Sequence, residues 1–238
     1  MQAISTADDG FLKCGGARLC SNAAMRLALW LLFVGAFAAL NLYGRSEGPR
    51  PDNDLVYQYS FAVGSLAGYA VLFSLVLALT VGLSRRDVLA LRAPASWRRS
   101  LALALGALVV IFIGAAAALS LSHAGDEQNL TPDGWDSSRA GAYALSFVAI
   151  VFVAPVTEEL LYRGVGLSLL LARTTVPVSV GVTALLFGLG HGLVLSLAAF
   201  VWFGIVIALL RIRTDSIYPA FAVHCTFNAI GMLVPLFF

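Results

Sequence analysis

Six polar or charged side chains interrupt long apolar stretches in the C-terminal part of the sequence. They are Glu158, Glu159, Arg163, His191, His224 and Asn228. A charged group at the centre of a bilayer costs about 2.5 to 3.5 kcal/mol on insertion scales, so ionisable residues inside membrane segments usually serve a function. A carboxylate, two imidazoles and an amide can together activate a water molecule and stabilise a tetrahedral intermediate. These residues therefore predict a hydrolytic site at membrane depth.

The spacing of the two glutamates predicts a different role for each. Glu159 and Arg163 are four residues apart with the acid first, which favours an ion pair within one helix. Glu158 points about 100° away around the helix and has no paired cation. We therefore expect Glu159 and Arg163 to neutralise each other, and Glu158 to act as a general base. Pro155, one turn earlier, is expected to free the carbonyl of Val151 and kink the helix.

The remaining polar residues predict hydrogen-bond donors from two other helices. His224 and Asn228 are four residues apart and therefore share one helix face. An imidazole N–H beside an amide NH₂ forms a pair of donors suited to a developing oxyanion. His191 brings a second imidazole, with Phe187 one turn before it on the same face.

The composition shows that the elements positioning these residues lie in a membrane. Of the 238 residues, 60% are hydrophobic and 12% are charged, and the mean hydropathy is +0.88. Soluble domains carry about 25% charged residues. The composition excludes a soluble globular enzyme and a secreted disulfide scaffold, and the net charge of +2 gives no basis for a nucleic-acid partner. We expect an all-α, polytopic integral membrane helix bundle with about seven transmembrane helices.

Seven apolar segments define this bundle. They cover residues 27–43, 55–83, 101–121, 140–171, 177–192, 193–210 and 217–238. If the helices alternate in direction, the polar residues of the fourth, fifth and seventh segments lie about 14 to 21 Å from one membrane face, at 1.5 Å per residue. Three helices therefore bring their polar groups to a similar depth. Residues 1–23 are expected to form a cytoplasmic tail, and residues 24–139 the N-terminal transmembrane helices.

The basic residues predict the orientation in the membrane. With seven alternating helices, eleven Lys and Arg residues fall on one side and three on the other. Cytoplasmic loops carry the excess of Lys and Arg, so we expect the N-terminus inside and the C-terminus outside. Lys13 is the only lysine, which suggests GC-rich bacterial coding and a bacterial cytoplasmic membrane. The arginine cluster in residues 84–100 is expected to contact membrane lipids.

Three motifs carry a resemblance to a known family. They are Glu158-Glu159-x-x-x-Arg163, Phe187-x-x-x-His191 and His224-x-x-x-Asn228. In order and separation they resemble the motifs of the CPBP intramembrane proteases, a family that includes the type II CAAX prenyl endopeptidases and the Abi bacteriocin-immunity proteins. The resemblance covers residues 140–238 and implies a CPBP-like catalytic membrane core there.

The resemblance implies an intramembrane glutamic endopeptidase that hydrolyses a peptide bond of a membrane-associated protein or peptide. Glu158 would activate the water, and His191 would help to bind it. His224 and Asn228 would form the oxyanion site, and the other residues of the three motifs would support them. No cofactor is implied. The sequence itself indicates neither the substrate nor the oligomeric state.

Other functions use similar residues. Glu158, His191 and His224 would also suit a catalytic zinc ion, but the sequence has no HExxH motif, so we rank this variant of the protease lower. A non-catalytic membrane scaffold or bacteriocin-immunity protein would keep the same fold and polar cluster and act by binding a partner. A proton-coupled transporter would also need buried Glu and His, but transporters often show repeated halves, which this sequence lacks.

Overall fold

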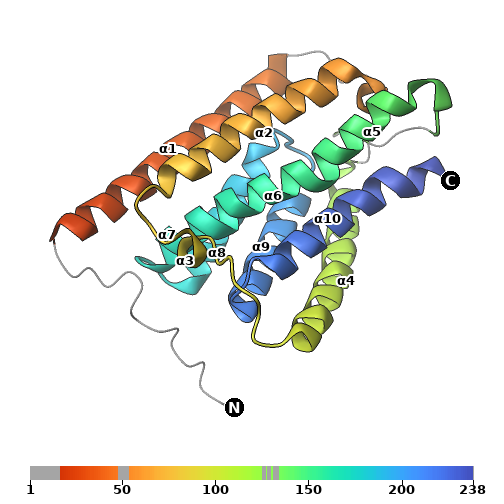
Figure 1. The fold of residues 1–238 in the computed structure, drawn as a ribbon. Helices are drawn as coiled ribbons and strands as arrows, with labels where there is room; N and C mark the ends of the chain where they lie inside the picture. The colour runs from red at the N-terminus through yellow and green to blue at the C-terminus, as the bar shows by residue number, and fades with distance from the viewer. Residues whose placement is uncertain (1–16, 48–53, 125–126, 128–129, 131–133, 238) are drawn as a thin grey trace.

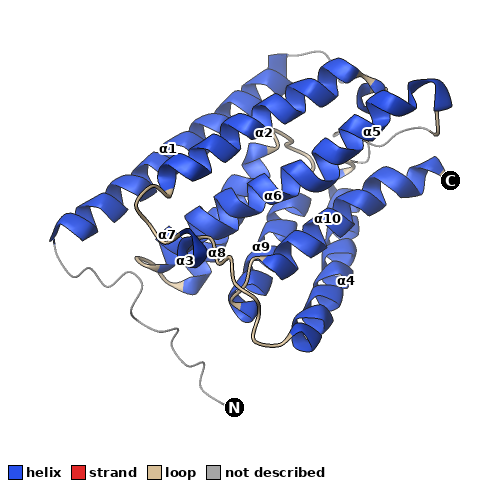
Figure 2. Cartoon of the chain, viewed as in Figure 1, coloured by secondary structure: helices blue, strands red, loops and turns tan. Residues whose placement is uncertain are grey.

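A computed structural model gives the fold of the protein and describes residues 17–47, 54–124, 127, 130 and 134–237. Within these ranges the chain forms helices, turns and loops and no β-strand (Figures 1 and 2). Six of the described helical segments are long and apolar enough to cross a membrane, and α8 (Val176–Gly190) is a shorter apolar helix. The predicted all-α membrane bundle is thus confirmed.

The N-terminal half contributes three long helices. They are α1 (Ala17–Glu47), α2 (Tyr59–Leu79) and α4 (Trp97–Ser122). A single helical turn, α3 (Arg85–Val88), lies between α2 and α4. The part of α1 that can cross a membrane is Ala23–Ser46, although the helix begins at Ala17. Of the predicted tail, residues 1–16 lie outside the described part of the chain.

The fourth apolar segment forms one long helical path over Ser137–Leu171. Two π-helical stretches, Ala149–Val153 and Glu159–Gly166, separate α5 (Ala140–Val148), α6 (Ala154–Glu158) and α7 (Leu167–Leu171). Each π-helical turn accommodates an extra residue, and such turns frequently occur at functional sites. In Figure 1 this path crosses the middle of the bundle, with α1 and α2 on one side and α10 and α4 on the other.

The last two helices are α9 (Leu197–Thr214) and α10 (Tyr218–Leu233). The predicted sixth segment begins at Leu193, but α9 begins at Leu197 because a turn follows α8. In this turn Gly192 has a φ of +68°, and a Cβ there would lie 2.7 Å from the carbonyl oxygen of Asn41. Both the left-handed backbone and the close approach to α1 require glycine.

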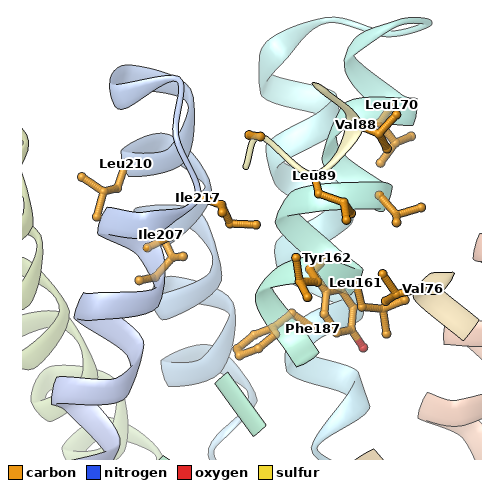
Figure 3. Packing of buried hydrophobic residues seen from close by; sticks show 14 of the residues in the cluster. Val76, Val88, Leu89, Leu161, Tyr162, Leu170, Phe187, Ile207, Leu210 and Ile217 are labelled. Carbon is orange, nitrogen blue, oxygen red and sulfur yellow. The ribbon is translucent and has the colours of Figure 1, made fainter. Parts of the chain in front are cut away.

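The largest hydrophobic core joins the N-terminal helices to the C-terminal ones. Trp30 of α1 is fully buried and donates its Nε1–H to the carbonyl of Leu161 at 3.0 Å. Its ring also occupies the space beside Gly166, where a Cβ would lie 2.2 Å away. Figure 3 shows another part of the same core, in which Leu89 and Phe187 pack near Leu161. Because the core spans residue 140, the division into 24–139 and 140–238 stays a prediction.

Candidate active site

A cavity of about 790 Å³ lies within the helix bundle. Four of the predicted site residues line it: Glu158, His191, His224 and Asn228. Phe187 also contributes to the lining, whereas Glu159 and Arg163 are fully buried behind it. The structure therefore brings residues of all three motifs to one cavity, although they come from α6, the end of α8, and α10.

Glu158 is the carboxylate that faces the cavity. It is the last residue of α6, and its exposed fraction is 9%. Its Oε1 accepts a hydrogen bond from the hydroxyl of Tyr69 on α2 at 2.9 Å, and its Oε2 lies 3.8 Å from Nε2 of His224. Within the described residues Glu158 has no Arg or Lys partner, as its helical position predicts.

Glu159 connects the first and third motifs. Its Oε1 lies 3.1 Å from Nη1 of Arg163, and both side chains are fully buried, so the predicted ion pair is present. The same oxygen lies 2.9 Å from Nδ1 of His224. An ionised carboxylate only accepts hydrogen bonds, so Nδ1 carries the proton and Nε2 is the ring nitrogen nearer to Glu158. Glu159 therefore orients an imidazole in addition to balancing a charge.

Phe187 and the backbone of α9 hold Arg163 in place. The guanidinium carbon lies 4.2 Å from the centroid of the Phe187 ring, which is within the range of a cation–π interaction. Nη2 also donates to the carbonyl of Gly204 at 3.4 Å. Phe187 stacks on Phe203 with ring centroids 5.7 Å apart. The supporting residues of the first two motifs thus form one packed unit under the cavity.

His191 lies at the end of α8, as its C-cap, and not within a continuous helix. Its Nδ1 lies 2.8 Å from the carbonyl oxygen of Phe187, one turn earlier. A carbonyl only accepts, so Nδ1 is the protonated nitrogen and Nε2 of the neutral ring accepts hydrogen bonds. The imidazole also stacks on Phe200 with centroids 4.0 Å apart and planes at 22°. These contacts from α8 and α9 fix the ring before any substrate binds.

Asn228 compensates for a missing backbone donor. Its Nδ2 donates to the carbonyl of Ile150 at 2.8 Å. The backbone just before Pro155 follows the five-residue hydrogen-bond spacing of a π-helix, so the carbonyl that lacks its partner at Pro155 is that of Ile150. The expectation that Pro155 frees Val151 rests on α-helical spacing, whereas in π-helical spacing the residue matched to Pro155 is Ile150. The amide has a second N–H, which is available to the cavity that Asn228 lines.

Tyr69 is a residue of the site that the sequence motifs do not predict. This residue lies on α2, outside the three motifs, and both lines the cavity and donates to Glu158. It is one of seven tyrosines, and nothing in its spacing separates it from the apolar residues around it. Only the packing of α2 against the fourth segment reveals its place in the site.

The zinc variant depends on how the His and Glu side chains of the cavity are placed. In the described part of the chain, no group of three or more His, Cys, Asp and Glu side chains is placed to hold a metal ion. The zinc variant needs Glu158, His191 and His224 to converge on one point. Nδ1 of each histidine is bonded, to the carbonyl of Phe187 and to Glu159 respectively, which leaves Nε2 of each ring for a ligand in the cavity.

Comparison with known proteins finds one family that resembles the C-terminal part of the chain. The family described as "Type II CAAX prenyl endopeptidase Rce1-like" matches residues 140–230, which contain all three motifs. This segment is therefore similar to a family of CAAX protease-type endopeptidases, and the match supports the resemblance that the motifs indicate. No curated protein and no solved structure matches the chain.

Proposed function

We propose that the protein is an intramembrane endopeptidase that hydrolyses a peptide bond of a membrane-associated protein or peptide. The observation that carries the proposal is the position of Glu158, a carboxylate inside the cavity beside Tyr69 and His224, with no Arg or Lys partner among the described residues. Such a carboxylate suits a general base. The match of residues 140–230 to a CAAX protease-type family supports the reaction class.

The first step is attack by water on the scissile carbonyl carbon. Glu158 takes one proton of a water molecule while the water oxygen forms the new C–O bond. Nε2 of His191 accepts the second hydrogen of the same water and orients it. The carbonyl oxygen becomes the oxyanion of a tetrahedral intermediate.

His224 and Asn228 stabilise the oxyanion. In the imidazolium form of His224, Nδ1–H donates to Glu159 and Nε2–H donates to the oxyanion. The second N–H of Asn228 is the other donor, while its first remains on the carbonyl of Ile150. Preorganised donors of this kind supply a large share of the rate in acyl transfer.

The intermediate then collapses and the C–N bond breaks. Glu158 returns its proton to the departing nitrogen, which leaves as an amine, and the other product is a carboxylic acid. Glu158 therefore serves as base and then as acid. No step uses a metal or an organic cofactor.

The test compares the wild type with Glu158→Gln after purification and reconstitution, on a panel of membrane-peptide substrates. Loss of a general base costs about 100- to 10,000-fold in rate, and we expect a loss of kcat in this range. Asp87→Asn, which also replaces a carboxylate by an amide but lies within α3, is the matched control and should leave activity unchanged. Full activity of Glu158→Gln would contradict the proposal.

Two further outcomes decide between the alternatives. We expect a chelator to leave the activity unchanged; a loss that zinc restores would favour the zinc variant. If the wild type cuts no peptide, and a partner protein co-purifies equally with the wild type and with Glu158→Gln, the scaffold or immunity function is favoured instead.

A further inference from the structure

Contacts between helix ends define two ends of the bundle. At the first end, Arg26, near the start of the membrane-spanning part of α1, donates to backbone carbonyls at the end of α2, and Arg92 pairs with Asp215 after α9. At the second end, the hydroxyl of Tyr143 near the start of α5 donates to the carbonyl of Met232 near the end of α10 at 2.7 Å. The first is called the arginine-rich end because most of the described arginines lie there, and the second is called the cavity end because the cavity opens there.

The cavity extends to the second of these ends. Its lining includes Asn41 and Arg45 from the last turns of α1, and Phe61 and Ser65 from the first turns of α2. Ser196, directly before α9, also lines it. Arg45 is exposed, so the cavity reaches the surface of the bundle here. The path from solvent to Glu158 therefore begins at the cavity end.

The charges of the described residues are distributed unequally between the ends. Nine arginines whose side chains the structure describes lie at the arginine-rich end: Arg26, Arg85, Arg86, Arg92, Arg98, Arg99, Arg173, Arg211 and Arg213. Among the described residues the cavity end has two, Arg45 and Arg139, and Arg139 is paired with Asp54 and Asp136. Because Lys and Arg accumulate on the cytoplasmic side of membrane proteins, the arginine-rich end is assigned to the cytoplasm.

An acidic residue helps to build the mouth of the cavity. Oε1 of Glu127 accepts hydrogen bonds from the backbone N–H groups of Val194 at 2.8 Å and Leu195 at 3.0 Å, and Oε2 accepts from Ser196 at 2.6 Å. Glu127 follows α4 in sequence and Ser196 lines the cavity, so this contact joins two loops at the cavity end. A carboxylate therefore fixes the loop before α9 at the mouth of the cavity. The described part of this end has few cations and carries this acidic residue.

We propose that the active-site cavity opens on the extracytoplasmic side and receives its substrate from there. The substrate is an apolar segment of a membrane-anchored peptide at the outer surface. Apolar side chains suit the cavity because its lining between the mouth and Glu158 includes Phe37, Phe61, Phe200 and Phe227. The proposal rests on the proposed endopeptidase function and specifies which side of the membrane supplies its substrate. A peptide tail confined to the cytoplasm would not reach this cavity.

Cysteine labelling in intact cells tests the orientation without requiring activity. Ser65→Cys, in the cavity lining, and Ser84→Cys, an exposed residue beside α3, form a matched pair in a variant whose native cysteines are replaced by serine. With the full-length protein in a bacterial host, we expect a membrane-impermeant maleimide to label Ser65→Cys in intact cells and Ser84→Cys only after permeabilisation. The reverse pattern, or equal labelling of both variants, would overturn the proposal.

A pair of single-span reporter peptides tests the side of cleavage. Both carry the same apolar target segment, placed next to the membrane on the outer side in one reporter and on the cytoplasmic side in the other. We expect cleavage of the outer reporter alone, abolished in Glu158→Gln. Cleavage of the cytoplasmic reporter alone would overturn the proposed side while leaving the endopeptidase function intact. Cleavage that persists in Glu158→Gln would contradict the function itself.

Discussion

Oε1 of Glu159 lies 2.9 Å from Nδ1 of His224, and this contact joins residues that are 65 positions apart in the sequence. The same oxygen bonds to Arg163, so one buried carboxylate binds a cation and an imidazole together. Because Nδ1 is fixed, the orientation of Nε2 in the cavity is fixed as well. The position of the oxyanion donor thus depends on a residue that does not itself line the cavity.

The first prediction concerns this buried ion pair. Arg163→Met leaves Glu159 buried without its cation, and removing one partner of a buried pair typically destabilises a protein by about 3 to 5 kcal/mol. The double variant Glu159→Leu/Arg163→Met buries no charge and should regain most of the free energy of unfolding. It should remain inactive, because His224 has lost the carboxylate that orients it. Thermal unfolding in detergent and peptide hydrolysis measure the two effects, and wild-type activity in the double variant would refute the positioning role.

The second prediction concerns the hydroxyl of Tyr69. Tyr69→Phe keeps the ring but removes the donor to Glu158, and a hydrogen bond to a charged group contributes about 1.5 to 3 kcal/mol. We therefore expect kcat to fall by roughly 10- to 150-fold with KM nearly unchanged. Tyr43→Phe, on the exposed surface of α1, is the matched control and should behave as the wild type. An unchanged kcat in a folded Tyr69→Phe variant would show that Glu158 does not depend on this contact.

The third prediction separates the two roles of Asn228. Asn228→Ala should lose activity and also about 1 to 3 kcal/mol of stability, because the carbonyl of Ile150 loses its donor. Pro155→Ala restores a backbone N–H in the register that reaches Ile150. The double variant Pro155→Ala/Asn228→Ala should therefore regain stability but not activity. If it also regains activity, Asn228 is not an oxyanion donor.

The fourth prediction concerns pH and the mouth of the cavity. Partial burial alone would raise the pKa of Glu127, but the hydrogen bonds from Leu195, Ser196 and Val194 outweigh it and lower the pKa below its ordinary value of 4.5. A carboxylate whose pKa is lowered by folding stabilises the folded state above its unfolded pKa. This contribution is lost as the pH falls through the lowered value.

Hydrogen exchange of the Ser196 backbone amide measures this effect. Exchange should be slow near neutral pH and, after correction for the intrinsic rate, should increase as the pH falls below about 4.5. In Glu127→Gln, protection should already be reduced at neutral pH and should not change over the same range. Equal protection in both proteins at every pH would mean that Glu127 does not hold this loop.

Much of the fold follows from local patterns in the sequence. Runs of apolar residues predict the spans, because each span must be long enough to cross the bilayer. Four-residue spacing predicts the Glu159–Arg163 pair, because it depends only on helix geometry. The gathering of Glu158, His191 and His224 at one cavity was predicted from their similar depth and is present in the structure.

The features that the sequence did not predict depend on tertiary structure or on departures from α-helical geometry. The π-helical stretch before Pro155 shifts the freed carbonyl to Ile150, and spacing rules based on 3.6 residues per turn cannot show this. Tyr69 enters the site through packing of α2 against the fourth segment. The contact of Glu127 with Ser196 joins two loops, for which no periodic pattern exists.

The most direct test of the central claim follows heavy oxygen from water into the product. With the reconstituted wild type and a membrane peptide in heavy-oxygen water, mass spectrometry should find one labelled oxygen in the new C-terminal carboxylate. With Glu158→Gln under the same conditions, labelled product should be lost to the extent that kcat is lost. Labelled product formed at the wild-type rate by Glu158→Gln would contradict the assignment of Glu158 as the base.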